Sequence, residues 1–213
     1  MTTSANQSTQ APRAKRASGS PRTQAERREA TKGLLLDAAR ELFCERGYGS
    51  TATPDIVKAA GVTRGALYHH FSDKSDLFSA VLQREAEAIG ELIDLRTRAL
   101  DDPLEAMQVG SDAYFEAMAV PGRAQLLLIE APAALGMAQA RAITQPNGTA
   151  ELRDGLSRAM PGADDNHLDA LADILAAAFD GAALAIAQGG DPTIYGNAMM
   201  EIMFKSMELE DGI

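Results

Sequence analysis

The spacing of apolar residues is the feature that most constrains how this chain folds. From about Gln24 onward, alternation of β-branched and polar residues is rare, and apolar residues recur at intervals of three and four, as on one face of a helix. In the first such segment, 24–46, these residues are Leu35, Ala38, Ala39, Leu42 and Phe43. The pattern predicts an all-α protein.

Composition excludes several other classes. The single cysteine, Cys44, excludes a disulfide framework and a zinc site built from several thiolates. The adjacent His69 and His70 would point about 100° apart on a helix, so we expect no metal site, and no bound cofactor is expected. No uninterrupted apolar run reaches about 18 residues, so we expect no membrane span. The first thirty residues lack the apolar core of a secretory signal, and a cytoplasmic location is the resulting expectation.

The first 22 residues differ from the rest of the chain. They contain no Val, Ile, Leu or aromatic residue, and their basic residues are Arg13, Lys15, Arg16 and Arg22. Such a segment buries too little apolar area to offset the entropy lost on ordering. We therefore expect a disordered basic tail over residues 1–22.

Two short helices are predicted at 54–60 and 64–70, each preceded by a threonine, Thr53 or Thr63, that can cap it. Between them, Gly61 lets the backbone turn sharply. The residues expected to pack between these helices are Ile56, Val57, Ala60, Val62 and Leu67. Two short helices joined in this way form a helix-turn-helix, a motif that places its second helix in the major groove of DNA.

Cap and break signals predict the other helix ends. Gly47 is expected to end the first helix, and Asp73 to cap a fourth. The later signals are a start at Asp102-Pro103, a break at Pro121-Gly122, a kink at Pro132, a break at 146–148, a stop at Pro161-Gly162, a cap at Asp165 or Asn166, and a last start at Asp191-Pro192.

The stretch from Leu34 to Leu82 resembles the DNA-binding domain of the tetracycline-repressor (TetR) family of transcriptional regulators. The matching residues are Ala38-Ala39, Leu42-Phe43, Gly47-Tyr48, Thr51, Asp55-Ile56, Ala59-Ala60-Gly61-Val62-Thr63, Gly65, Leu67-Tyr68, His70-Phe71, Lys74 and Leu77. The resemblance implies a three-helix helix-turn-helix DNA-binding domain over 24–84. It also implies a larger helical domain over 85–213 for ligand binding and dimerisation.

The second short helix is the expected recognition element. Gly65 and Ala66 near its start allow close approach to base edges in a groove about 12 Å wide. The resemblance implies phosphate contacts for Tyr68 and Lys74, whereas Arg64 either reads guanine or touches phosphate only. The full expected set of DNA-binding residues is Thr53, Thr63, Arg64, Gly65, Ala66, Tyr68, His69 and Lys74. The next two residues, His70 and Phe71, are expected to pack inward.

The net charge of −10 is unevenly distributed. Residues 1–80 hold 12 Lys and Arg against 8 Asp and Glu, whereas residues 81–213 hold 8 against 22. The basic end suits DNA contact, and the acidic part suits a body that faces away from the duplex. Arg27 and Arg28, together with the tail, either follow DNA phosphates or only keep the protein soluble.

An effector pocket is expected among the helices between 103 and 160. The apolar residues expected to line it are Met107, Tyr114, Phe115, Met118, Leu127 and Met137, with Leu128 and Ile143 beside them. The residues expected to orient a ligand are Arg123, Glu130 and Arg141.

The helix that contains Leu168 is apolar over most of its surface, and the last helix adds apolar residues such as Ile194, Ile202 and Met203. The resemblance implies that these two helices form a four-helix bundle with those of a second subunit. The expected dimerisation residues are Leu168, Leu171, Leu175, Phe179, Ala182, Ile186, Ile202 and Met203. The alternative is that these helices only fill the core of a single chain.

These features predict a DNA-binding transcriptional regulator: a homodimeric repressor that a small-molecule effector releases from a palindromic operator. One alternative is a regulator that acts without a ligand or activates transcription. A more remote alternative is an enzyme or carrier with a vestigial DNA domain. It lacks support, because the sequence has no nucleophile elbow, H-E-x-x-H or phosphate loop, and His167 is the only histidine outside the motif.

Overall fold

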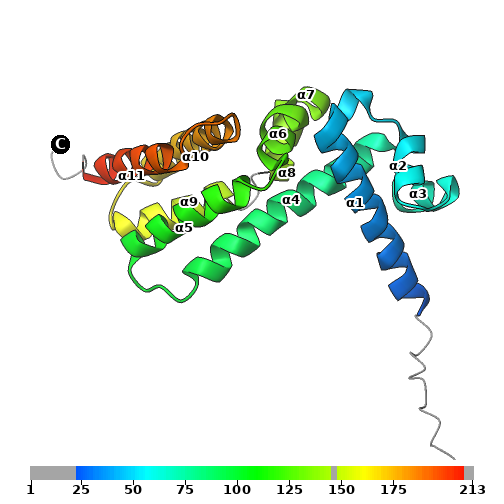
Figure 1. Ribbon diagram of the computed structural model, residues 1–213. Coiled ribbons are helices and arrows are strands. Elements are labelled where there is room, and N and C mark those ends of the chain that lie inside the picture. Colours follow the sequence, from blue (N-terminus) through cyan, green and yellow to red (C-terminus); the bar gives the residue numbers. More distant parts are fainter. Residues whose placement is uncertain (1–22, 145–147, 209–213) are drawn as a thin grey trace, which may run out of the picture.

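The computed structural model describes residues 23–144 and 148–208, and every element in these ranges is helical, as predicted. One end of the molecule holds α1 (Gln24–Ser50), α2 (Thr53–Ala59) and α3 (Arg64–His70), from which the long α4 (Lys74–Thr97) leads away (Figure 1). The other helices are α5 (Pro103–Met118), α6 (Arg123–Gln125), the π-helix η1 (Leu126–Glu130), α7 (Ala131–Leu135), α8 (Met137–Thr144), α9 (Gly148–Ala159), α10 (Asp165–Ala187) and α11 (Pro192–Glu208). The expected tail at 1–22 and the Pro146-Asn147 break lie outside the described residues.

Two of the predicted N-terminal caps are confirmed. The Thr63 hydroxyl accepts from the Ala66 amide at 3.2 Å, and the Asp73 carboxylate accepts from the Asp76 amide at 2.8 Å. The predicted cap at Thr53 is wrong. Thr53 is the first residue of α2, because the following amides already bond to the carbonyl of Ala52, which has no side-chain cap bond.

The helical geometry of α1 is interrupted at Gly47, the residue at which the first helix was expected to end. Gly47 has a φ of 75° and a ψ of 164°, and after it a further helical turn continues to Ser50. Thr51 is buried at the end of this turn, where its hydroxyl donates to the carbonyls of Leu42 and Gly47 at 3.2 and 2.8 Å. These bonds tie Thr51 to a carbonyl before the break and to that of Gly47 itself, and they hold the last turn in place.

A single apolar core joins the first four helices to those that follow. Phe43, Leu67 and Phe78 are buried in it, and it continues into Leu126 of η1 and Ala131 of α7. The expected division between two domains, at 84/85, falls inside α4, which packs along α5 (Figure 1). The helix-turn-helix end and the larger helical part therefore share a continuous helix.

The predicted kink at Pro132 is a π-helical turn that precedes it. The Ala131 amide bonds to the Leu126 carbonyl, five residues back, and Pro132 lies in the first turn of α7. Proline has no amide hydrogen, so Pro132 cannot donate the next hydrogen bond of a regular α-helix. The π-helical turn just before it shifts the hydrogen-bond pattern and accommodates the missing donor.

The helix α10 begins one residue earlier than predicted. Asp164, rather than Asp165 or Asn166, is its cap and accepts from the amides of Asn166 and His167 at 3.0 and 3.2 Å. Contrary to the sequence expectation, α10 is long and apolar enough to cross a membrane, and it is the one such helix among the described residues. It packs against α9 and α11, and one helix of this kind is weak evidence for a span.

Candidate DNA-binding surface and effector cavity

The helix α3 is anchored on one side and exposed on the other. Leu67 is completely buried, whereas Arg64, Tyr68 and His69 are exposed. Gly65 is also exposed, and a Cβ added there would meet only the Thr63 hydroxyl, at 3.9 Å. Of the two residues expected to pack inward, Phe71 is buried and its neighbour His70 is half-buried. The outer face of α3 is thus exposed, and near the start of the helix Gly65 has no side chain to keep another molecule away from the backbone.

The start of α2 contributes to this surface. The Arg64 guanidinium lies over the Tyr68 ring, 5.5 Å from its centroid. The Thr53 side chain first, and Arg64 second, lower the pKa of the Tyr68 hydroxyl. Thr53, Arg64 and Tyr68 therefore form one polar group of the kind that contacts phosphates and base edges.

Lys74 has a structural role that the sequence analysis missed. Its ammonium donates to the carbonyls of Tyr48 and Thr51 at 2.8 and 3.0 Å, and it lies 4.1 Å from the centroid of the Tyr48 ring. These contacts tie the start of α4 to the end of α1. Two of the three N–H donors of Lys74 are therefore used within the protein, and the phosphate contact expected of it stays a prediction.

Basic residues of α1 lie near the end of α3. Burial first, and then the charges of His69, Arg28 and Lys32, lower the pKa of His70. From the sequence, Arg28 was given two possible roles, in DNA contact or in solubility, whereas Lys32 was overlooked because it stands apart from the basic tail. Both extend the basic character of α3 along α1.

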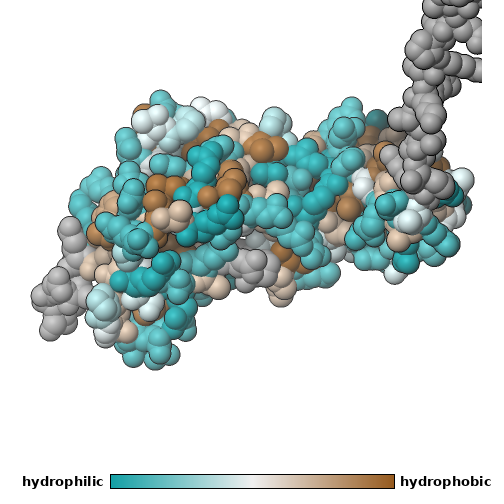
Figure 2. Space-filling view, turned by 90° about the horizontal axis from the view of Figure 1, so that it is seen from below, coloured by the Kyte–Doolittle hydropathy of each residue, from teal (hydrophilic) through white to brown (hydrophobic). Residues whose placement is uncertain are grey.

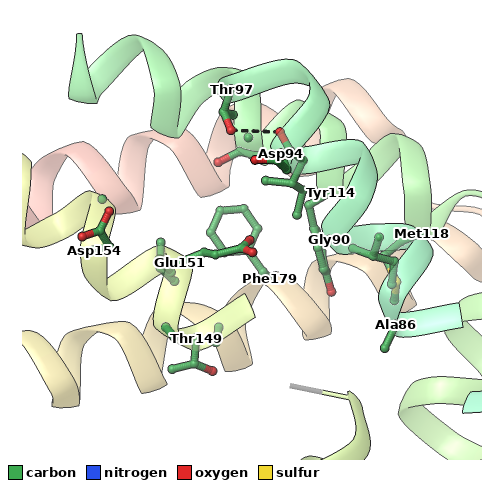
Figure 3. Close-up of a pocket in the computed structure, with 18 of the residues that line it drawn as sticks. Ala86, Gly90, Asp94, Thr97, Tyr114, Met118, Thr149, Glu151, Asp154 and Phe179 are labelled. Carbon is green, nitrogen blue, oxygen red and sulfur yellow. Dashed lines mark hydrogen bonds between the residues drawn. The ribbon is translucent and has the colours of Figure 1, made fainter. Parts of the chain in front are cut away.

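A cavity of about 850 Å³ lies among α4, α5, η1, α8, α9 and α10 (Figure 3). Met107, Tyr114, Met118 and Leu127 line it, together with their neighbours Leu128 and Ile143. This volume lies within the range of about 300–1,000 Å³ that is typical of small-molecule sites.

Two of the apolar residues expected in the pocket are not among its lining residues. Phe115 packs against the rings of Tyr114 and Phe179, each with a centroid separation of 5.6 Å. Met137 lies on α8 with 64% of its surface exposed. These predictions were wrong because helical spacing identifies an apolar face but not what that face meets.

None of the polar residues expected to orient a ligand lines the cavity. Glu130 turns toward α1, Arg123 is buried beside Glu85, and Arg141 is exposed on α8. The polar lining instead includes Asp94, Glu151 and Asp180, which the sequence analysis missed.

Tyr114 is the aromatic residue with a polar contact in the cavity. Its hydroxyl donates to Asp180 at 2.7 Å. Burial first, and the Asp180 charge second, raise the pKa of Tyr114 well above its ordinary value. Tyr114 therefore stays a neutral hydrogen-bond donor.

Glu130 connects η1 to the bend in α1. Its carboxylate accepts from the Tyr48 amide at 2.8 Å. Nearby, Gly122 brings the start of α6 against α1 with a φ of 80°, and a Cβ there would lie 2.5 Å from the sulfur of Cys44. Because η1 also carries Leu127 and Leu128, this π-helix touches the cavity and the helix-turn-helix end at once.

A buried ionic cluster joins the same parts of the molecule. Glu85 accepts from Arg40 of α1 and from Arg123 of α6, each at 2.9 Å. Burial alone would raise the pKa of Glu85, but the hydrogen bonds from the two arginines outweigh it and hold that pKa below its ordinary value. The signal in the sequence was a glutamate on the apolar stripe of α4, which predicts a buried partner.

Most residues expected at the dimer interface are not available to a second chain. Leu168, Leu175, Phe179, Ala182 and Met203 are buried in a core shared by α5, α9, α10 and α11. Leu171 and Ile186 are half-buried, and Ile202 is exposed. For the five buried residues, the alternative of a core within one chain is the correct one.

The outer side of α10 and α11 carries exposed apolar residues. Ile174 and Ile194 are each 66% exposed, and Ile202 is 51% exposed. Only 28% of the apolar window of α10 is buried. Figure 2 shows, for one face of the molecule, how apolar residues interrupt the hydrophilic surface of the larger helical part.

Two family models match the chain. The model described as bacterial regulatory proteins of the tetR family matches residues 35–81, and that of the tetracyclin repressor-like C-terminal domain matches residues 104–207. The regulator AcrR of Shigella flexneri is 40% identical over 99 residues, which are 46% of this chain and 46% of AcrR. The repressor BepR of Brucella suis is 38% identical over 108 residues, 50% of this chain and 51% of BepR. The chain thus aligns with about half the length of these curated relatives.

Solved structures match over more of the chain. A TetR-family regulator from Pectobacterium atrosepticum is 30% identical, with a TM-score of 0.60, over 88% of this chain and 95% of that one. A second, from Syntrophomonas wolfei, has a TM-score of 0.73 over 84% of this chain and 95% of that one, and at 15% identity it shows the fold alone. With both family models and a solved relative matched over nearly its whole length, the chain belongs to the TetR family of bacterial regulatory proteins.

Proposed function

We propose that this protein is a cytoplasmic, homodimeric repressor of transcription that a small-molecule effector releases from operator DNA. The observation that carries the proposal is the outer face of α3, where Arg64, Gly65 and Tyr68 are exposed while Leu67 and the Thr63 cap anchor the helix. A helix held in this way can enter a major groove without losing its own support.

The exposed isoleucines of α10 and α11 support dimerisation. Ile174, Ile194 and Ile202 would be buried if the two helices packed against those of a second copy. A dimer also places two recognition helices on one operator, about 34–36 Å apart, and this spacing matches a palindromic sequence.

The π-helix η1 offers a route from effector to DNA. A ligand that displaces Leu127 or Leu128 in the cavity would also shift Glu130, whose carboxylate holds the Tyr48 amide. That shift would turn α1 and the helix-turn-helix relative to the larger part. The effector would then favour a state with the wrong spacing between recognition helices, and affinity for the operator would fall by linkage.

Footprinting of the purified protein on DNA upstream of its own and neighbouring genes tests the proposal. We expect the protected DNA to be a palindrome whose two half-sites lie about one helical turn apart. The absence of any protected site would contradict DNA binding.

Loss of the protein distinguishes a repressor from an activator. Both kinds occur among the relatives, since BepR of Brucella suis is named a repressor and FasR of Mycolicibacterium smegmatis an activator. We expect transcription from the protected promoter to rise when the gene is deleted. A fall would identify an activator instead.

A further inference from the structure

The polar lining of the cavity has an excess of negative charge. Its acidic residues are Glu87, Asp94, Glu151, Asp154 and Asp180, and its basic residues are Arg98 and Arg158. Arg158 pairs with Asp154 at 3.2 Å. Among the described residues, no lysine or arginine lies within ion-pair distance of Asp94 or Glu151.

Glu151 is one of the acidic residues that line this space. Figure 3 shows its side chain extending from α9 toward the Phe179 ring, with Asp94 of α4 on another wall. Burial first, and the charge of Asp94 second, raise the pKa of Glu151. Both residues line the cavity while they remain exposed to solvent, so their carboxylates repel each other, and a positive group placed between them would relieve that repulsion.

The rest of the wall is apolar and aromatic. The Tyr114 and Phe179 rings meet edge to face with centroids 5.7 Å apart, and Met107 and Met118 lie beside them. Ring faces attract cations, and methionine side chains adapt to irregular apolar shapes. An anionic ligand would instead bring its charge against Asp94 and Glu151.

Resting on the proposed function, we infer that the effector is an amphipathic organic cation. Its apolar body lies against Tyr114 and Phe179, and its positive group lies between Asp94 and Glu151.

Two probe ions of matched size and opposite charge test the inference. Tetraphenylphosphonium and tetraphenylborate carry the same four phenyl groups, so a difference in binding reports the sign of the charge. We expect the phosphonium to bind the full-length protein at least about tenfold more tightly than the borate, measured by isothermal titration calorimetry.

Neutral variants of the two carboxylates locate the charge. Glu151→Gln and Asp94→Asn each keep the side-chain shape, and each is expected to weaken phosphonium binding by about three- to tenfold. Asp112→Asn is the matched control, because Asp112 is exposed on α5 and does not line the cavity. It is expected to leave phosphonium binding unchanged, and thermal unfolding of each variant checks that the fold is intact.

Equal binding of the two ions, tighter binding of the borate, or binding of neither overturns the inference. So does an Asp112→Asn variant that weakens phosphonium binding as much as Glu151→Gln does. If any of these results is found and the protein still protects operator DNA in the footprinting experiment, the proposed function stands while the ligand class is wrong. If the phosphonium binds tightly but no DNA is protected, the ligand class stands while the proposed function is wrong.

Discussion

At the scale of single residues, Arg64 separates two ways of meeting DNA. If its guanidinium reads a guanine, Arg64→Ala should weaken operator binding by about 1–3 kcal/mol and relax specificity at one base pair. If it touches phosphate only, affinity should fall equally for operator and scrambled DNA, and the salt dependence should drop by about one charge. Fluorescence anisotropy with both DNA sequences at several salt concentrations distinguishes these outcomes.

Arg141→Ala is the control for this measurement. Arg141 is exposed on α8, so this substitution removes the same charge at a place away from α3. It should leave operator affinity nearly unchanged. Equal losses in the two variants would mean that Arg64 acts only through the overall charge of the protein.

Glu85 is the residue on which the ionic cluster depends. Its replacement in Glu85→Gln would leave Arg40 and the buried Arg123 without their common carboxylate, at a cost of about 3–5 kcal/mol in the free energy of unfolding. The control is Asp37→Asn, because the pair between Asp37 and Arg84 lies at the surface and contributes less than about 1 kcal/mol. Urea denaturation measures both, and similar losses would contradict the special role of Glu85.

The lowered pKa of Glu85 also predicts a dependence on pH. Its stabilising contribution is complete above the ordinary pKa of 4.5 and is lost as the pH falls through the lower pKa of the folded state. The difference in unfolding free energy between the wild type and Glu85→Gln should therefore be constant near neutral pH and shrink below pH 4.5. A difference that stays constant down to pH 2, about two units lower, would contradict this account.

At the scale of elements, η1 is one of the connections between the cavity and the helix-turn-helix. Glu130→Ala removes the acceptor of the Tyr48 amide, which should cost about 1–3 kcal/mol of stability. It should also reduce the factor by which an effector lowers operator affinity, because the two sites would share one contact fewer. Anisotropy titrations of operator DNA with and without tetraphenylphosphonium measure this factor.

The matched control for this variant is Glu116→Ala, which removes an exposed glutamate that pairs with Arg96 on the neighbouring α4. We expect it to keep the full effector response. If Glu130→Ala keeps that response as well, the coupling runs through α4 or the Glu85 cluster and not through η1.

At the scale of the whole molecule, the exposed apolar face of α10 and α11 predicts a dimer. A charge at Ile174 or Ile202 would be buried in that interface, so Ile174→Glu and Ile202→Glu should shift the protein to monomers and weaken operator binding. Sedimentation velocity measures the state of assembly. Leu95→Glu is the control, because Leu95 is also exposed, at 57%, but lies on α4, and it should leave the dimer intact. A wild-type protein that sediments as a monomer would contradict the prediction.

Much of the fold follows from local signals in the sequence. The Thr63 and Asp73 caps and the bounds of α3 agree with expectation because each depends on a few neighbouring residues. The start of α2, the further turn from Gly47 to Ser50 and the π-turn before Pro132 do not, because they are settled by bonds such as those of Thr51 and by packing between α1 and η1.

The site divides in the same way. The exposed residues of α3 could be named from the motif, whereas the acidic lining of the cavity, the Glu130 contact and the Glu85 cluster could not. Glu130 lies 82 positions from Tyr48, and Glu85 lies 45 and 38 positions from Arg40 and Arg123, and nothing in the intervening sequence records that these residues meet.

The sequence by itself determined an all-helical TetR-family chain with a recognition helix at 64–70, because helical period, caps and the turn at Gly61 act over a few residues. Only the tertiary structure decided which apolar faces become core, cavity or exposed surface. Helical spacing marks a face as apolar, but the neighbouring helices decide what covers it, so Phe179 and Met203 are buried in the single chain and Ile174 is left exposed.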